Sequence, residues 1–533
     1  MSVNVLPQEV ILSIFQFLDF SDLNSVVQVC RHWRSIGVDP NLWKTFKVLT
    51  MWPEDLETVL SVPRLSKIQH VKISAWLADE HVETLKYANL KILDISWSYL
   101  LDVNPKLLSE VVNDIEVVNA DRANLSDEQW VEIFQRMSDS TRIKTLIIKS
   151  AEEPLEDEDI ITDLSHINPD VFAKAINKLE IVEISEASLT SEQLEVIIKY
   201  MDKNSNIKEL GLADNDISKI DSEAVAKALN NLKKLDLSCT NLGDQENPNI
   251  FFKQMVDSTK LQRLDLGFNT FKNQNNNTDL DSKLFARALN KIPNLRMIGV
   301  EMSNVHAQQF FKRMCLQTRI EELNFDDCHY DESLVNPNFM ACGLNKLTKL
   351  TIANSSINSD QCLELFTRMA KSTNLQYLDF SMLDLSEVPT DILVLALNKL
   401  DTVILCDCQM IEDQTSILFK TIAISTNINH LDLSYVSLEH VSAEVFSDGA
   451  VEIETFIAVN STLLKEQMEA ILLKVSFTTK LKLFQVSFED AFVISDEVIE
   501  NNELLLKTPK LEELKITEEY ERDDSNWMQF NFL

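Results

Sequence analysis

LKKLDLSCTNL, residues 232–242, and LQRLDLGFNTF, residues 261–271, share one pattern of apolar spacing. In each stretch, apolar side chains stand at positions one, four and six. Positions four and six of an extended segment face the same side, whereas the residues between and beside them face the other. The pattern therefore predicts a short strand with one buried face and one polar face.

The apolar-x-x-apolar-x-apolar signature recurs along most of the 533-residue chain. Its 17 copies begin at residues 68, 90, 115, 143, 179, 207, 232, 261, 295, 320, 347, 375, 400, 428, 453, 481 and 511. The intervals are mostly 25 and 28 residues, and the two lengths alternate. One copy cannot bury its apolar face alone, so we expect neighbouring copies to stack into a one-dimensional array.

Two kinds of helical segment alternate between the strands. One kind is short and ends in a phrase such as AKALNNL or LALNKL before the next strand. The other is longer and opens near a glutamine, at Gln129, Gln193, Gln309, Gln361, Gln414 and Gln467. Ser126 and Gln129 have the capping-box spacing that satisfies N–H groups at a helix start, and the same spacing joins Thr190 to Gln193.

Position nine of the repeat carries a small polar side chain in many copies. These residues are Asn215, Asn269, Cys328 and Cys408, with Thr240, Ser303, Ser355 and Ser461 in other copies. A small polar group at this place can form a hydrogen bond with the adjacent backbone. We therefore expect Cys328 and Cys408 to have a structural role.

These periods, with their L-x-x-L-x-L-x-x-N/C-x-L phrasing, resemble leucine-rich repeats. The resemblance implies an α/β fold, a curved solenoid of about 17 repeats of alternating type. Parallel strands would form its concave face and helices its convex face. The alternation is similar to that of the ribonuclease-inhibitor branch, although the 25-residue copies depart from that pattern.

Two repeats are stretched by polar insertions. Residues 151–166, AEEPLEDEDIITDLSH, carry seven carboxylates and no lysine or arginine, and residues 272–279, KNQNNNTD, are rich in asparagine. Both follow a strand and precede a helix, so we expect both on the same rim of the solenoid. Their few apolar residues favour disordered rim loops, and the alternative is a loop that grips a cationic partner.

Residues 6–46, LPQEVILSIFQFLDFSDLNSVVQVCRHWRSIGVDPNLWKTF, follow a helical pattern instead. Pro7 suits a first helical turn, and apolar residues then recur at three- to four-residue spacing as far as Leu18. Ser21 is expected to cap a second helix. A unit of ~40 residues is near the lower limit of independent stability, so we expect a partner to complete it.

This stretch resembles an F-box along its whole length, on Leu6-Pro7, Glu9, Ile14-Phe15, Leu18, Leu23, Val29-Cys30, Trp33 and Leu42-Trp43. The resemblance implies docking to the adaptor subunit of an SCF-type (cullin–RING) ubiquitin ligase. The implied contacts are Leu6, Pro7, Glu9, Ile11, Phe15, Leu18, Leu23, Val29, Cys30 and Trp33. We expect Leu6, Pro7, Ile11, Phe15 and Leu18 to be exposed before docking. An alternative is a three-helix cap that only closes the repeat array.

The predicted domains are therefore an N-terminal three-helix F-box over residues 1–47 and a leucine-rich-repeat domain over residues 68–533. Residues 48–67 are interpreted as a linker or a degenerate first repeat.

Composition narrows the class of function. A net charge of −35 repels nucleic acid and anionic lipid surfaces and favours a basic protein partner, although an acidic surface also serves solubility. The seven glycines include no G-x-G spacing for a phosphate-binding loop. No stretch reaches the ~18 uncharged residues of a membrane span, so we expect a soluble protein of the cytoplasm, the nucleus or both.

No catalytic constellation is apparent in the sequence. The eight histidines form no H-E-x-x-H pair, and no C-x-x-C pair indicates a zinc site. Cys406 and Cys408 form a lone C-x-C without a nearby histidine, which is weak support for a metal or a nucleophile. We therefore expect a binding protein, not an enzyme, with no cofactor.

The strand residues at positions three and five face the hollow of the predicted solenoid. Position five holds Asp94, Glu183, Asp236, Asp265, Asp379 and Asp432. We predict a substrate site at Lys234, Asp236, Arg263, Asp265, Tyr377, Asp379, His430 and Asp432. Two alternatives are that these aspartates only keep an exposed sheet soluble, or that the site lies in the acidic insertion or in residues 518–533.

Three functions fit these patterns. The first is the substrate-recognition subunit of an SCF ligase, in which the F-box binds the adaptor, and through it the cullin, while the repeats bind the substrate. The second is an F-box scaffold outside ubiquitin transfer. The third is a ribonuclease-inhibitor-like protein that wraps a basic target, which leaves residues 6–46 unexplained.

Overall fold

The computed structural model describes residues 7–18, 26, 29–37, 39, 42, 49–50, 69–86, 90–149, 162–229, 231–271, 280–475, 480–488 and 513–518. The chain divides into two compact units, Met1–Asp265 and Leu266–Leu533. Most of the acidic insertion, the whole asparagine-rich insertion and most of residues 518–533 lie outside the described residues.

Unit 1 alternates strands and helices along the chain. Its helices are α1 (Gln8–Phe15), α3 (Arg31–Gly37), α6 (Asp79–Lys86), α7 (Pro105–Asn113), α8 (Asp127–Asp139), α9 (Pro169–Ile176), α10 (Ser191–Asn204), α11 (Ser222–Leu229), η3 (Leu242–Asp244) and α12 (Pro248–Asp257). Its strands are β1 (Leu49–Thr50), β2 (His70–Lys72), β3 (Ile92–Asp94), β4 (Val117–Asn119), β5 (Thr145–Lys149), β6 (Ile181–Ser185), β7 (Glu209–Gly211), β8 (Lys234–Asp236) and β9 (Arg263–Asp265).

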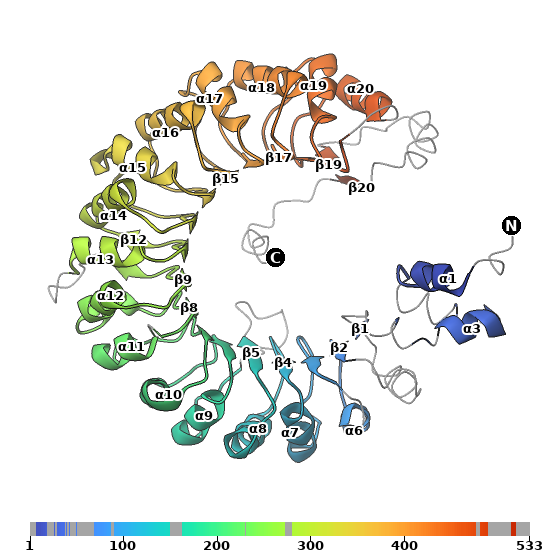
Figure 1. Cartoon of the computed structure of the whole chain (residues 1–533), viewed down its shortest axis with the longest axis vertical. Helices are drawn as coiled ribbons and strands as arrows, with labels where there is room; N and C mark the ends of the chain where they lie inside the picture. The colour runs from blue at the N-terminus through green and yellow to red at the C-terminus, as the bar shows by residue number, and fades with distance from the viewer. Residues whose placement is uncertain are drawn as a thin grey trace. The chain divides into compact units, whose positions relative to one another are not determined.

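Strands β1 to β9 pair in chain order, and every pair is parallel. Within unit 1 these strands lie on one side and helices α6 to α12 on the other (Figure 1). Strand β1 lies in the segment that the sequence left as a linker or a degenerate repeat, and its Leu49 pairs with Val71.

Unit 2 has the same alternation. Its helices are α13 (Ser282–Leu289), α14 (Asn304–Leu316), η4 (Glu332–Leu334), α15 (Pro337–Leu344), α16 (Ser359–Lys371), α17 (Thr390–Leu397), α18 (Glu412–Ile424), α19 (Ala443–Ala450) and α20 (Lys465–Val475). Its strands are β10 (Thr270–Phe271), β11 (Asn294–Arg296), β12 (Glu301–Met302), β13 (Glu322–Asn324), β14 (Lys349–Thr351), β15 (Tyr377–Asp379), β16 (Thr402–Ile404), β17 (His430–Asp432), β18 (Thr455–Ala458), β19 (Leu483–Phe488) and β20 (Glu513–Glu518).

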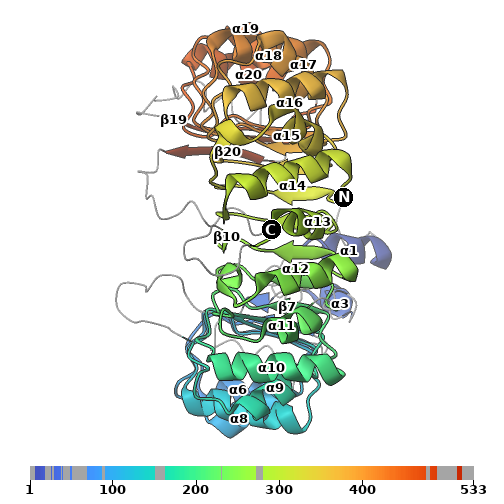
Figure 2. The same cartoon turned by 90° about the vertical axis from the view of Figure 1, so that its left-hand side faces the viewer.

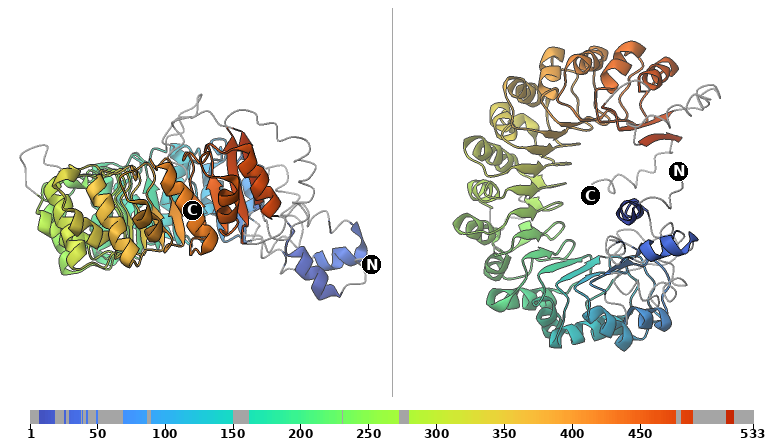
Figure 3. Two further views of the ribbon diagram at one scale, coloured as in Figure 1. Left: turned by 90° about the horizontal axis from the view of Figure 1, so that it is seen from above. Right: turned by 45° about the vertical axis from the view of Figure 1, so that its right-hand side comes forward.

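In unit 2, strand β11 and strands β13 to β20 form one parallel sheet in chain order, and β10 pairs with β12. Consecutive helices such as α14, α15 and α16 stack side by side over the sheet (Figure 2). The same two-layer arrangement is visible within each unit in the right-hand view of Figure 3. The predicted α/β leucine-rich-repeat solenoid is confirmed.

The register of the repeats follows the sequence signature, with one correction. The repeat strands begin two residues after the first residue of the signature, as β8 does after Leu232. The predicted start at Leu295 is wrong by three residues, because β11 begins at Asn294 and the signature therefore begins at Ile292. Ile292, Leu295 and Met297 are the fully buried set of this repeat.

Position eight of the repeat, in the turn that follows the strand, has a left-handed backbone conformation in many copies. The φ values at this position lie between 49° and 62°. The residues are Trp97, Arg122, Glu186, Asp214, Cys239, Phe268, Gly299, Asp327, Asn354, Met382, Asp407, Tyr435 and Asn460. A left-handed L-residue is sterically unfavourable, so the surrounding repeat imposes this turn on side chains as large as tryptophan. Gly299 occupies the turn only in the corrected register.

The glutamine that recurs at the start of the longer helices forms hydrogen bonds with the preceding repeat. Gln129 Nε2 donates to the carbonyl oxygens of Leu100 at 2.6 Å and Val103 at 2.7 Å in the preceding repeat. Its Oε1 accepts the Ser126 N–H, completing the predicted capping box. The capping box of Thr190 with Gln193 is also confirmed.

Helix α14 departs from this plan, and two predictions at its start are wrong. His306 takes the place of the glutamine, because its Nε2 contacts the Leu280 carbonyl at 3.0 Å and its Nδ1 contacts Ser303 Oγ at 2.7 Å. Gln309 lies one turn further along and is only half-buried. Ser303 precedes the helix instead of occupying position nine, which is Val300 in the corrected register.

The other polar residues predicted at position nine form the expected hydrogen bonds with the backbone. Asn215 Nδ2 donates to the Ile184 carbonyl at 2.9 Å, which lies in the preceding repeat. Cys328 Sγ donates to the Met297 carbonyl at 2.7 Å. Cys408 Sγ donates to the Phe380 carbonyl at 3.1 Å. The structural role predicted for these two cysteines is confirmed.

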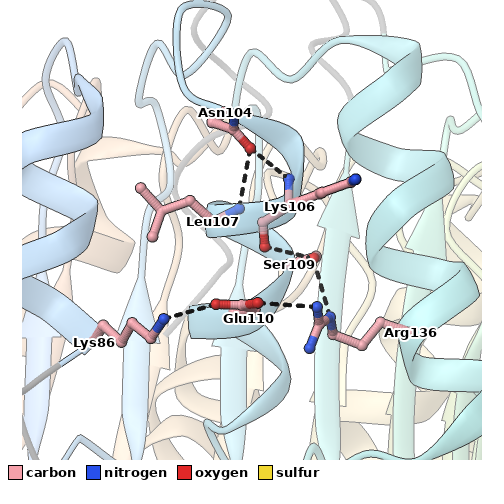
Figure 4. Close-up of polar contacts among 7 residues, drawn as sticks. All are labelled: Lys86, Asn104, Lys106, Leu107, Ser109, Glu110 and Arg136. Atoms are coloured by element: carbon pink, nitrogen blue, oxygen red, sulfur yellow. Dashed lines mark hydrogen bonds and ion pairs between the residues drawn. The ribbon is translucent and has the colours of Figure 1, made fainter.

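Polar contacts also join neighbouring helices on the outer layer. Glu110 on α7 accepts from Lys86 Nζ on α6 at 2.7 Å and lies 3.3 Å from an Arg136 guanidinium nitrogen on α8 (Figure 4). The Asn104 side chain caps α7 by accepting the N–H groups of Lys106 and Leu107 (Figure 4). These contacts fix the spacing of three successive helices within unit 1.

Candidate protein-binding surfaces

Helices α1 and α3 pack through an aromatic contact. Phe15 meets Trp33 edge-on, with ring centroids 5.7 Å apart and an interplanar angle of 71°. Ile11 and Phe15 are buried, as are Ile36 and Leu42. The expectation that Ile11 and Phe15 are exposed is therefore wrong, because α1 turns these two residues toward α3.

A different strip of α1 is exposed. Val10 and Ile14 are both more than two fifths exposed, and Phe17 in the following turn is 90% exposed. These residues recur at four- and three-residue spacing, one residue before the buried strip, so they occupy the adjacent face. Val29 is exposed as well. The sequence could not separate two apolar strips that run side by side on one helix.

The other predicted adaptor contacts have mixed environments. Pro7 is exposed, whereas Leu18, Cys30 and Trp33 are half-buried. Leu6 and Leu23 lie outside the described residues, and Glu9 is described only as part of the α1 backbone.

In unit 1, the predicted substrate residues lie on the strands β8 and β9. Lys234 is directly opposite Arg263, and Asp236 is opposite Asp265. Lys234 Nζ forms an ion pair with Glu209 Oε2 at 2.8 Å. Asp236 Oδ1 accepts from the N–H and the hydroxyl of Ser238 at 2.9 and 2.6 Å. Both charges therefore have partners within the repeat face.

In unit 2, the predicted residues lie on β15 and β17, with β16 between them. Tyr377 and His430 are separated by Thr402. Asp379 and Asp432 are separated by Ile404 in the same way. These four side chains therefore share one face of the sheet across three adjacent strands, and they are the half of the predicted set that lies in unit 2.

Each of the two aspartates on this face is held by a serine two residues later. Asp379 Oδ1 accepts the Ser381 N–H at 3.1 Å and its hydroxyl at 2.7 Å. Asp432 Oδ1 accepts the equivalent bonds from Ser434 at 2.9 and 2.6 Å. The Asp-x-Ser sequence thus forms local hydrogen bonds in the turn at the end of the strand. These bonds give the two carboxylates a structural role besides any binding role.

Two residues of this face were missed in the sequence. Asp326 stands at position seven of its repeat, and burial together with the negative charge of Asp379 raises its pKa to about 7. Lys349 Nζ lies 4.3 Å from the ring centroid of Tyr377. The repeat period predicts that position seven also faces this side, since residues i, i+2 and i+4 of a strand share a face.

The electrostatics of this face follow from its burial. Burial raises the pKa of Asp379 and of Asp432, and it lowers the pKa of His430. Burial, with the charge of Asp379, also raises the pKa of Tyr377. A cationic side chain from a partner would relieve the cost of ionising these carboxylates. Among the described residues, no group of three or more His, Cys, Asp or Glu is placed to hold a metal ion.

The described helices include none with the length and apolar character needed to cross a membrane. All eight cysteines lie within the described ranges and are free thiols.

Comparison with known proteins identifies the N-terminal region. The F-box-like family model matches residues 3–48. The F-box/LRR-repeat protein 21 of Mus musculus is 29% identical over 108 residues, which are 20% of this chain and 23% of that protein. The chain thus aligns with less than a quarter of this curated relative. An LRR protein of Leptospira interrogans matches 88% of this chain and 99% of its own, with 15% identity and a TM-score of 0.37.

An F-box-like domain followed by leucine-rich repeats defines an F-box/LRR architecture. The chain has this architecture, with the F-box-like domain at its N-terminus and the repeats in both compact units.

Proposed function

We propose that the chain is the substrate-recognition subunit of an SCF (cullin–RING) ubiquitin ligase. The F-box-like domain would bind the adaptor and, through it, the cullin, while the repeats bind a protein substrate. The observation that carries this proposal is the exposed apolar strip of Val10, Ile14 and Phe17 within the region that the F-box-like family matches.

Exposed apolar side chains on so small a helical region favour a protein interface. Such residues stay in contact with water until a partner covers them, and a few of them typically dominate the binding energy. F-box domains generally bind the SCF adaptor, so this strip has a partner of known class. The chain would have a non-enzymatic function, and we propose that it acts in the cytoplasm, the nucleus or both.

Purified adaptor tests the F-box proposal directly. Replacing Ile14 and Phe17 by aspartate should weaken adaptor binding roughly 1,000-fold, because two interface anchors are each typically worth ~2 kcal/mol. Leu334→Asp is a matched control, since it also places a charge at an exposed apolar site, more than half accessible, but in unit 2. Undiminished adaptor binding by the Ile14 and Phe17 variant would contradict the proposal.

The substrate site is proposed on the sheet face of unit 2. Tyr377→Ala with Asp379→Lys and Asp432→Lys should remove the substrate from purified complexes and leave the adaptor bound. Asp94→Lys with Glu183→Lys makes similar charge changes on the sheet face of unit 1, at residues outside the predicted set, and serves as the control. Loss of substrate with the control alone would place the site in unit 1 and refute the assignment to unit 2.

A further inference from the structure

An aromatic surface follows the first strands of unit 1. We define the aromatic rim as Trp76, Trp97, Tyr99 and Arg122, which follow β2, β3 and β4. The rings of Trp76 and Tyr99 are stacked, with centroids 5.2 Å apart and an interplanar angle of 16°. The guanidinium carbon of Arg122 lies 4.5 Å from the ring centroid of Trp97. The rim thus holds two aromatic sites on neighbouring repeats.

The backbone fixes the rim in place. Trp76 and Tyr99 form a parallel bridge, in which the Tyr99 N–H donates to the Ala75 carbonyl at 3.1 Å and the Leu77 N–H donates to the Tyr99 carbonyl at 2.9 Å. Trp97 and Arg122 both occupy the left-handed turn of their repeats. The aromatic rings therefore stand on ordered backbone, so little conformational entropy would be lost when a ligand binds them.

The rim is open to solvent. Trp76 is 67% exposed and Trp97 is 40% exposed, although tryptophan is one of the residues most strongly driven to bury its surface. Tryptophan, tyrosine and arginine are also the residues enriched at the energetic centres of protein interfaces. These rings do not serve the core, because the buried residues of the same repeats are Val71, Ile73, Leu93 and Ile95.

The two aromatic sites differ in one respect. Trp97 already carries a cation, the guanidinium of Arg122. Over the Trp76–Tyr99 stack, the described part of the chain places no lysine or arginine. The first pair shows that this surface accommodates a guanidinium on an indole, and the second pair offers the same chemistry with no cation from the described residues over it.

The charges around the stack complement a cation. The segments 73–85 and 95–105, which include Trp76 and Tyr99, contain no lysine or arginine. They contribute the exposed carboxylates Asp79, Glu80 and Asp102. Carboxylates on the segments that carry the stacked rings favour a cationic ligand over an anionic one.

We propose that the Trp76–Tyr99 stack binds an arginine side chain in a basic segment of a partner protein. Arginine fits better than lysine because its guanidinium is planar, stacks on aromatic rings and is more weakly hydrated than an ammonium. This binding site is distinct from the exposed strip of α1 and from the sheet face of unit 2, and it does not depend on the proposed ligase role.

The test compares two synthetic peptides of equal length and charge with the full chain, by isothermal titration calorimetry. One peptide alternates glycine with arginine, and the other alternates glycine with lysine. The wild-type chain should bind the arginine peptide several-fold more tightly, within the roughly 2- to 30-fold that one cation–π contact supports. Equal affinity for the two peptides would overturn the proposal.

Variants distinguish binding by the Trp76–Tyr99 stack from general electrostatic attraction to an acidic protein. Trp76→Ala with Tyr99→Ala should abolish the arginine preference, so that the two peptides bind with equal affinity. Trp76→Phe, which keeps a ring, should retain the preference and shows that the region still folds. Tyr200→Ala, at an exposed tyrosine on α10, is the matched control and should have no effect. A preference that persists in the double variant would overturn the proposal.

Discussion

Gln414 Nε2 donates a hydrogen bond of 2.8 Å to the main-chain carbonyl of Leu385, which lies 29 residues earlier in the preceding repeat. The same nitrogen donates to the Val388 carbonyl at 2.7 Å, and Oε1 accepts the Ile411 N–H at 3.0 Å. One fully buried side chain thus satisfies three backbone groups and joins two repeats.

Gln414→Leu keeps the side-chain size but removes these three hydrogen bonds. The Leu385 carbonyl still accepts the Val388 N–H at 3.0 Å, whereas the Val388 carbonyl and the Ile411 N–H lose the bonds that Gln414 provides. We expect this substitution to lower the stability of the region by about 3 kcal/mol, because each buried unsatisfied group costs about 1–3 kcal/mol. Hydrogen exchange of peptides covering 385–424 would measure the loss. Gln309→Leu is the control, since Gln309 occupies no such position, and an equal loss there would contradict the assigned role.

Met382 tests the left-handed turn at position eight. Its φ is 62°, and its side chain is 41% exposed. Gly tolerates this conformation and alanine does not, so Met382→Gly should be more stable than Met382→Ala by about 1 kcal/mol after allowing for the greater chain entropy of glycine. Thermal unfolding of the two variants gives the difference. If alanine proved the more stable, the turn would not carry the inferred strain.

Gly449 tests the close approach of α18 and α19. A Cβ at this position would lie 2.8 Å from the Phe419 carbonyl oxygen and 2.9 Å from its ring. Gly449→Ala should therefore destabilise unit 2 by about 1–3 kcal/mol, as overpacking does in other cores. Glu444→Ala, on the exposed side of the same helix, should stay within about 0.5 kcal/mol of the wild type. Similar urea midpoints for both variants would refute the close contact.

The pH dependence of stability tests the buried Asp326. Burial raises its pKa to about 7, so the native state binds more protons than the unfolded state between roughly pH 4 and pH 7. Its contribution to stability therefore falls as the pH rises through this window. Asp326→Asn, which keeps an acceptor for the Ala353 N–H, should gain about 4 kcal/mol over the wild type at pH 8 and nothing at pH 4.

Glu110 should show the opposite dependence of stability on pH. The hydrogen bond from Lys86 lowers the pKa of Glu110, so its contribution to stability is present above the unfolded pKa and is lost as the pH falls through the folded pKa. Glu110→Gln should therefore be less stable than the wild type at neutral pH and equal to it in acid. A gain at neutral pH in the Glu110 variant, or none in the Asp326 variant, would contradict these assignments.

The sequence predicted the repeat strands well because burial imposes one spacing on every copy. It failed at β11 because Ile292-x-x-Leu295-x-Met297 and Leu295-x-x-Ile298-x-Val300 satisfy the same signature three residues apart. Only the left-handed turn at Gly299 separates the two registers, and apolar spacing does not report backbone conformation. His306 was missed for a related reason, since the hydrogen bonds needed at that position can be made by more than one side chain.

The candidate sites were predictable to different degrees. The sheet face of unit 2 follows from strand alternation, which fixes the side on which Tyr377 and Asp379 lie. The exposed strip of α1 does not follow from sequence, because Ile14 and Phe15 are equally apolar and only the packing of α3 selects which one is buried. The Trp76–Tyr99 stack was missed because its two rings come from different repeats and follow the strands instead of lying within them.

Affinity purification of the full chain from cells, followed by mass spectrometry, tests the proposed function most directly when the wild type is compared with the Ile14→Asp, Phe17→Asp variant. The wild type should recover the SCF adaptor, a cullin and a protein that carries ubiquitin. The variant should retain that protein but lose adaptor and cullin, and the protein should lose its ubiquitin. Wild-type purifications without adaptor or cullin, or a variant that recovers them undiminished, would contradict the account.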